Sequence, residues 1–164
     1  MNPPSEPMLR KYAIEPLAEV SMTGGTEWAV LQRFGAMLEK AGLTRHGQRT
    51  AEALLYQSPF RSCFVQPVTE AGPNAALLRV RSGDLRGPAV CLATIPAGWS
   101  RRHFVHPLHL LALVAGPSGD DVAEELASRM CRILSEPAPR EALVRCATAH
   151  DLVEALAGAE LAVR

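Results

Sequence analysis

Two kinds of side chain in this sequence could carry chemistry: a pair of closely spaced histidines and a group of arginines in the middle of the chain. His103 and His106 flank Phe104-Val105, and two imidazoles at that spacing could supply a nucleophile or bind a metal ion. No carboxylate lies near them in the sequence, so no histidine–carboxylate metal motif is visible. We expect the other histidines to have structural or exposed roles. These are His46 and His150 near helix starts and His109 in a strand.

The arginines polarise a chain whose net charge is zero. Residues 71–102 hold five arginines and one aspartate, a net charge of +4. Residues 119–164 hold nine carboxylates and five arginines, a net charge of −4. Guanidinium groups can bind phosphate or carboxylate in a bidentate way, so the basic segment is either a set of solvated positions or a site for an anion or acidic partner. Its arginines are Arg79, Arg81, Arg86, Arg101 and Arg102.

The cysteines show no metal-binding or redox motif. They form no CxxC pair and no Cys/His cluster with zinc spacing, so we expect no metal site and no cofactor. Cys91, Cys131 and Cys146 lie in apolar runs, which predicts buried thiols of a reducing cytoplasm. Cys63 is expected to be more exposed.

Length and composition describe one ordinary globular domain: 164 residues, 48% of them hydrophobic and 21% charged. The zero net charge argues against a general nucleic-acid binder, which needs a basic excess. No apolar run reaches the roughly 18 residues of a membrane span. The start of the chain is proline-rich and polar, which predicts a flexible segment over residues 1–20 ahead of a single domain over residues 21–164.

Apolar periodicity and turn residues divide the chain into helices and strands. The predicted helices cover residues 26–41, 48–57, 121–134, 137–146 and 151–157. The predicted strands cover residues 75–80, 88–94 and 108–115, and the last is apolar enough to be buried on both faces. Strands in the middle of the chain, with helices before and after them, predict an α/β fold in which helices sandwich a mixed β-sheet.

Several segments together carry a resemblance to a known family. They read LEKAGL at residues 38–43, PLHLLALVAGP at 107–117, LSEP at 134–137, REAL at 140–143 and ATAHDLVEAL at 147–156. In their order and spacing they resemble the IIA domain of the fructose/mannitol-type bacterial phosphotransferase system. That class includes the nitrogen-regulatory IIA-like proteins. The resemblance covers roughly residues 20–160 and implies the fold of these IIA domains.

The family's signature strand reads roughly G-x-G-[VI]-A-[IV]-P-H-[AGT]-R. The resemblance implies that its histidine accepts a phosphoryl group from a phosphocarrier protein and passes it on. The corresponding residues 72–81 read GPNAALLRVR. Leu78 stands where the family has proline, and Arg79 stands where it has the phosphoacceptor histidine. Arg81 keeps the basic residue two positions later.

Other positions depart from the phosphotransfer pattern too. The family's Arg-Glu pair after its second helix falls near Gln57-Ser58, and a second family histidine falls at Val122 or Ala123. A guanidinium keeps its proton, so Arg79 cannot act as the nucleophile that phosphoryl transfer needs. It can bind an anion instead. The sequence therefore predicts a regulatory or protein-binding IIA-like domain without the phosphotransfer activity, a pseudoenzyme, with its partner site at the arginines.

Two other functions stay open. An active phosphoryl carrier in sugar transport or nitrogen regulation would need a relocated histidine, for which His103 and His106 are the candidates. A structural subunit of a larger assembly is the third possible function. Trp99 and Phe104 are expected to be exposed and would suit a homodimer contact. The expected partner is a protein, either a regulatory target or a phosphocarrier-like protein, in the bacterial cytoplasm, with no nucleic acid and no membrane insertion.

Overall fold

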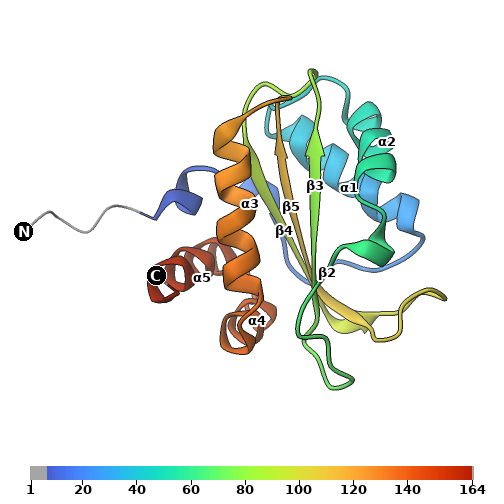
Figure 1. The fold of residues 1–164 in the computed structure, drawn as a ribbon, viewed down its shortest axis with the longest axis vertical. Helices are drawn as coiled ribbons and strands as arrows, with labels where there is room; N and C mark the ends of the chain where they lie inside the picture. Colours follow the sequence, from blue (N-terminus) through green and yellow to red (C-terminus); the bar gives the residue numbers. More distant parts are fainter. Residues whose placement is uncertain (1–6, 164) are drawn as a thin grey trace, which may run out of the picture.

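The computed structural model describes residues 7–163, apart from the side chain of Arg61, and places one five-stranded sheet between two groups of helices (Figure 1). The strand order is β1 (Ala18–Glu19), β4 (Ala89–Trp99), β5 (Leu108–Gly116), β3 (Ala75–Arg81) and β2 (Phe64–Val65). The central strand β5 runs antiparallel to β4 and parallel to β3. The predicted α/β class and mixed sheet between helices are confirmed.

One face of the sheet is covered by α1 (Glu27–Lys40) and α2 (Gly47–Gln57). The Thr26 side chain caps α1 by accepting a hydrogen bond from the Ala29 amide at 3.1 Å. The two helices approach closely where Gly35 faces Gly47, because a Cβ at Gly35 would lie 2.2 Å from the Gly47 carbonyl oxygen. Glycine at these positions therefore sets how tightly the helices cross, and with it the position of the end of α2.

The other face is covered by α3 (Asp121–Leu134), α4 (Pro137–Val144) and α5 (Ala149–Ala162). Side chains cap the two longer helices: Asp120 accepts from the Ala123 amide at 3.0 Å, and Thr148 accepts from the Asp151 amide at 3.0 Å. The last helix is longer than the predicted residues 151–157. Among residues 7–163, no helix is both long and apolar enough to span a membrane.

The N-terminal segment is part of the folded domain. Two 3-10 turns, η1 (Met8–Lys11) and η2 (Glu15–Leu17), lead into β1, which pairs in parallel with β4. The buried Glu160 carboxylate accepts hydrogen bonds from the amides of Met8 at 3.0 Å and Leu9 at 2.9 Å. The prediction of a flexible segment over residues 1–20 is therefore wrong for residues 8–19, and residues 1–6 lie outside the described part of the chain.

The strand β4 continues five residues beyond its predicted end, and its pairing with β5 shifts register between Thr94 and Trp99. Trp99 is 4% exposed, and its indole N–H donates to the Gly25 carbonyl oxygen at 3.0 Å. Its ring contacts Phe104 edge-on, with the centroids 5.2 Å apart. The prediction that Trp99 and Phe104 are exposed is wrong for Trp99, and the half-buried Phe104 packs into the same cluster. Neither ring supports a homodimer contact.

Candidate functional site

The edge of β3 is completed by side chains. β2 pairs only with Ala75 and Ala76, at the start of β3. Farther along, the hydroxyl of Ser58 accepts from the Arg79 amide at 2.8 Å and donates to the Arg79 carbonyl oxygen at 2.7 Å. The Gln57 side chain bonds the amide and carbonyl of Arg81 in the same way, at 2.8 and 2.9 Å. The end of α2 thus substitutes for a neighbouring strand and fixes the main chain at residue 79.

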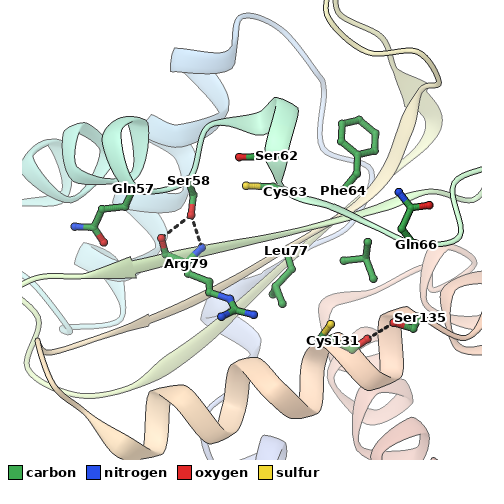
Figure 2. Close-up of a pocket in the computed structure, with 11 residues that line it drawn as sticks. Gln57, Ser58, Ser62, Cys63, Phe64, Gln66, Leu77, Arg79, Cys131 and Ser135 are labelled. Carbon is green, nitrogen blue, oxygen red and sulfur yellow. Dashed lines mark hydrogen bonds between the residues drawn. The ribbon is translucent and has the colours of Figure 1, made fainter.

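A cavity of about 510 Å³ opens beside this edge. Its lining comes from β3, from the end of α2 with the turn and strand that follow, and from the C-terminal part of α3. Figure 2 shows the side chains of Arg79 and Leu77 pointing from β3 toward α3, which carries Cys131 and ends just before Ser135. Alternation along the strand explains this direction, because Leu78 and Val80 point to the opposite face and pack under α1 and α2.

Arg79 is the charged group among the described side chains that line the cavity. Its side chain forms no ion pair with any carboxylate of residues 7–163. Burial raises the pKa of the nearby Cys63 thiol, while the adjacent hydroxyls of Ser58 and Ser62 and the positive charge of Arg79 oppose that rise. Cys63 therefore stays a thiol near neutral pH, and Arg79 is left as a fixed cation at an open cavity.

The serine hydroxyls of the cavity are held by the main chain. Ser58 donates to Arg79, Ser62 donates to the Pro59 carbonyl oxygen at 3.0 Å, and Ser135 donates to the Cys131 carbonyl oxygen at 2.6 Å. Of the five histidines, all of which the structure describes, none lines this cavity. A serine needs a neighbouring general base to become a nucleophile, so these hydroxyls are positioned for structure and not for covalent catalysis.

Part of this lining was not predicted from the sequence. Cys131 is exposed and Cys63 is buried, so the predicted exposures of these two cysteines were wrong. The apolar periodicity of α3 could have indicated that Cys131 is exposed. Its buried stripe includes Leu126, Met130 and Ile133, and Cys131 lies just beside that stripe. Gln66 was missed because β2 is only two residues long and left no strand pattern to recognise.

The structure separates Arg81 from the cavity. The Arg81 guanidinium donates to the carbonyl oxygens of Val80 at 3.1 Å and Val114 at 3.3 Å, and it pairs with Glu124 of α3 at 3.0 Å. Its side chain is 18% exposed. These partners neutralise its charge and hold it against the end of the sheet, so Arg81 does not join Arg79 at an open surface.

The other three arginines of the basic segment lie elsewhere. Arg86 donates to the Gly42 carbonyl oxygen at 3.3 Å, and Arg101 donates to the Gly25 carbonyl oxygen at 3.1 Å. Gly25 and Gly42 flank the 14 residues of α1, a helix about 20 Å long. Arg102 is exposed on the loop between β4 and β5. The structure therefore disperses the five arginines and places only Arg79 in the cavity.

The histidine pair lies beside a second cavity, of about 320 Å³, lined by His103, His106 and Val105 together with Phe64 and Gln66 of the neighbouring segment. Among residues 7–163 no group of three or more histidine, cysteine, aspartate or glutamate side chains is placed to hold a metal ion. The structure thus keeps both histidines on the β4–β5 loop, at a cavity that shares Phe64 and Gln66 with the cavity of Arg79 but does not include Arg79.

Two of the remaining three histidines contact other parts of the fold through their rings. His109 is half-buried on the central strand, and its Nδ1 accepts a hydrogen bond from the Asn74 amide at 3.1 Å. His150, in the first turn of α5, contacts Glu15 through Nδ1 at 2.8 Å. These contacts agree with the predicted structural roles of both residues.

Known protein sequences show little similarity to this chain. No model of a known protein family matches the sequence. A stretch of 76 residues is 34% identical to part of the glycine–tRNA ligase beta subunit of Delftia acidovorans. That stretch covers 46% of this chain and 10% of the ligase subunit, so the match spans about a tenth of its relative and shows no family.

Comparison with solved structures is consistent over nearly the whole chain. The nitrogen regulatory protein IIA-Ntr of Neisseria meningitidis superposes with a TM-score of 0.66 at 15% identity, covering 91% of this chain and 99% of that one. Enzyme IIA for mannitol of Escherichia coli, solved in complex with phosphorylated enzyme IIB, gives 0.64 at 14% identity, covering 87% and 95%. The cryptic mannitol-specific enzyme IIA of Escherichia coli gives 0.63 at 13% identity, covering 93% and 99%.

These likenesses establish the fold. The chain has the fold of phosphotransferase IIA domains of the mannitol and nitrogen-regulatory type, as the sequence resemblance predicted. At 13–15% identity they do not carry an activity from one protein to another.

Proposed function

We propose that this protein is a IIA-like regulatory domain that binds a protein partner through the surface around Arg79 and accepts no phosphoryl group there. The observation that carries the proposal is a IIA-type fold whose cavity presents Arg79, the residue that the sequence resemblance aligns with the family's acceptor histidine. The role is proposed for the bacterial cytoplasm, where phosphotransferase regulators would meet their partners.

The chemistry of Arg79 supports binding over transfer. A phosphoryl acceptor must present a neutral nitrogen with a free lone pair, as a histidine does near neutral pH. A guanidinium stays protonated and has no such lone pair, but it attracts carboxylate and phosphate groups. An unpaired cation at an open cavity therefore suits recognition of an acidic surface or group on a partner.

The direct test is a phosphoryl-transfer assay. The protein is incubated with phosphoenolpyruvate, enzyme I and the phosphocarrier protein, and a histidine-containing mannitol IIA domain serves as the positive control. We expect the control to gain an acid-labile phosphoryl group and this protein to gain none, measured by intact mass at neutral pH. A phosphohistidine on this protein would overturn the proposal.

The same assay addresses the relocated-histidine alternative. If a phosphoryl group does appear, the variants His103→Gln and His106→Gln decide whether either residue carries it. The structure gives no specific support to this alternative, because neither histidine lines the cavity of Arg79, although the two cavities share Phe64 and Gln66. The third reading, a structural subunit, has no specific observation in its favour either.

A further inference from the structure

We propose that the cavity beside Arg79 binds a small monocarboxylate with an apolar body, which makes the IIA-like domain sensitive to a metabolite. The inference deepens the proposed function at the same site, because a ligand on Arg79 would compete with an acidic partner. It does not depend on the phosphoryl-transfer result.

The charge at the cavity matches a monoanion. Arg79 contributes the single charge among the described lining side chains and has no ion-pair partner within residues 7–163. A guanidinium binds one carboxylate through two parallel hydrogen bonds. The lining from α3 comes from its C-terminal end, at Cys131 and Ser135, where the helix dipole places partial negative charge. A phosphate dianion would be partly repelled there, whereas a single carboxylate is balanced by Arg79.

The donors that remain free also favour a carboxylate. The hydroxyls of Ser58, Ser62 and Ser135 already donate to main-chain carbonyl oxygens. The Gln57 amide is engaged with the main chain of Arg81. The Gln66 side chain makes no hydrogen bond with the described residues, but Figure 2 shows it at the other end of the lining, pointing away from Arg79, which leaves Arg79 as the free donor. The two parallel N–H groups of the Arg79 guanidinium suit the two oxygens of one carboxylate, whereas phosphate sites are usually built from many donors.

The rest of the lining would hold an apolar body. Leu77 and Val65 each leave 7% of their surface exposed, and the half-buried Phe64 borders the same space. The cavity volume of about 510 Å³ falls within the range of small-molecule sites. A carboxylate on Arg79 would therefore place an aliphatic or aromatic chain along Leu77 toward β2.

The thiol of Cys131 allows occupancy to be measured without an activity assay. Cys131 is exposed at the cavity, whereas the partly exposed Cys146 lies outside it and serves as the internal control. The folded protein is alkylated with a maleimide, and labelling of each cysteine is followed by peptide mass spectrometry. The probes are 4-phenylbutyrate, phenyl phosphate and the neutral 4-phenylbutanol.

We expect 4-phenylbutyrate to slow labelling of Cys131 severalfold, without affecting Cys146, and the neutral alcohol to have little effect. The variant Arg79→Gln should weaken this protection about tenfold or more, since a hydrogen bond to a charged group is lost. The control variant Arg102→Gln should leave it unchanged, because Arg102 lies on another loop. Ser58 holds the main chain of Arg79 and not its guanidinium, so Arg79→Gln should fold, and its unfolding midpoint checks this.

The proposal is overturned if 4-phenylbutyrate gives no selective protection up to its solubility limit, or if Arg79→Gln is protected as well as the wild type. Stronger protection by phenyl phosphate than by 4-phenylbutyrate would overturn the carboxylate assignment. These outcomes are distinct from failure of the proposed function. A phosphohistidine would refute the regulatory role while leaving the labelling result intact, and an unprotected Cys131 would leave the phosphoryl-transfer result intact.

Discussion

The Ser58 hydroxyl bridges the amide and the carbonyl of Arg79, at 2.8 and 2.7 Å, and Ser58 is only 6% exposed. Ser58→Ala would leave two main-chain groups without a partner, and we expect it to lower the free energy of unfolding by about 2 kcal/mol. Urea unfolding followed by circular dichroism measures this change.

The control for Ser58 is Ser62→Ala. Ser62 is exposed, and its hydroxyl donates to the Pro59 carbonyl oxygen within its own turn. We expect a change within about 0.5 kcal/mol for this variant, as for most surface substitutions. Equal effects of the two substitutions would show that Ser58 does not hold the edge of β3.

Glu160 ties the N-terminal turn η1 to α5 and pairs with Arg129 at 2.8 Å, and its side chain is 3% exposed. Glu160→Ala leaves two amides and a partly buried guanidinium without their acceptor, so we expect a loss of about 3–5 kcal/mol in the free energy of unfolding. Hydrogen exchange should accelerate at the Leu9 amide before the rest of the domain opens. Glu154→Ala is the matched control, because Glu154 pairs with Arg10 at the exposed surface and should cost at most about 1 kcal/mol. Slow exchange at Leu9 in Glu160→Ala would contradict the prediction.

The helices and main strands could be predicted because their signals are local. Residues 121–134 combine an acidic N-terminal cap with a 3.6-residue apolar repeat, and the structure gives the same bounds for α3. The short strands were not predictable in this way. β1 and β2 each have two residues, so their pairing depends on distant partners and leaves no periodic pattern.

The candidate site was predicted only in part. Arg79 was identified by aligning one strand with a family signature, and the alternation of β3 turns it toward α3. The prediction that Arg79, Arg86 and Arg101 form one site was wrong, because residues that are close in sequence need not lie on the same face of the fold. Arg86 and Arg101 bind main-chain carbonyls near opposite ends of α1. The ordered segment before residue 20 was missed because the buried Glu160 that holds it lies about 150 residues away.

His109 makes the stability of the fold sensitive to acid. Its Nδ1 accepts from the Asn74 amide at 3.1 Å, and burial lowers its pKa below the ordinary value of 6.5. The folded protein therefore binds fewer protons at this site than the unfolded chain. The stabilisation is complete above about pH 6.5 and declines as the pH falls toward the lowered pKa of the folded state.

The test for His109 compares wild type with His109→Gln in urea unfolding between about pH 8 and pH 5. We expect the wild type to lose more stability than the variant on acidification, because the variant lacks the titrating ring. The other histidines are common to both proteins and cancel in the comparison. Parallel pH profiles would argue against a role for His109.

The glycines of α1 and α5 should respond oppositely to the same substitution. A Cβ at Gly35 would lie 2.2 Å from the Gly47 carbonyl oxygen, so Gly35→Ala must push α1 and α2 apart, at a cost of about 1–3 kcal/mol. A Cβ at Gly158 meets no atom within 4 Å, so Gly158→Ala should stabilise α5 by about 0.5–1 kcal/mol. Thermal unfolding midpoints of the two variants should move in opposite directions. A rise for Gly35→Ala would show that the two helices are not closely packed.

The cysteines should react in the order of their exposure in the fold. Cys131 is exposed on α3, whereas Cys63 is buried with its thiol donating to the Pro59 carbonyl oxygen at 3.2 Å. Burial also raises the pKa of Cys63, which lowers its thiolate fraction. With a thiol-reactive disulfide at about pH 8, we expect Cys131 to react at least about tenfold faster than Cys63. Cys131→Ser should remove the fast phase, and unfolding in urea should make the remaining thiols equally reactive. A fast phase that survives in Cys131→Ser would place the reactive thiol elsewhere and remove the reporter on which the ligand test at Arg79 depends.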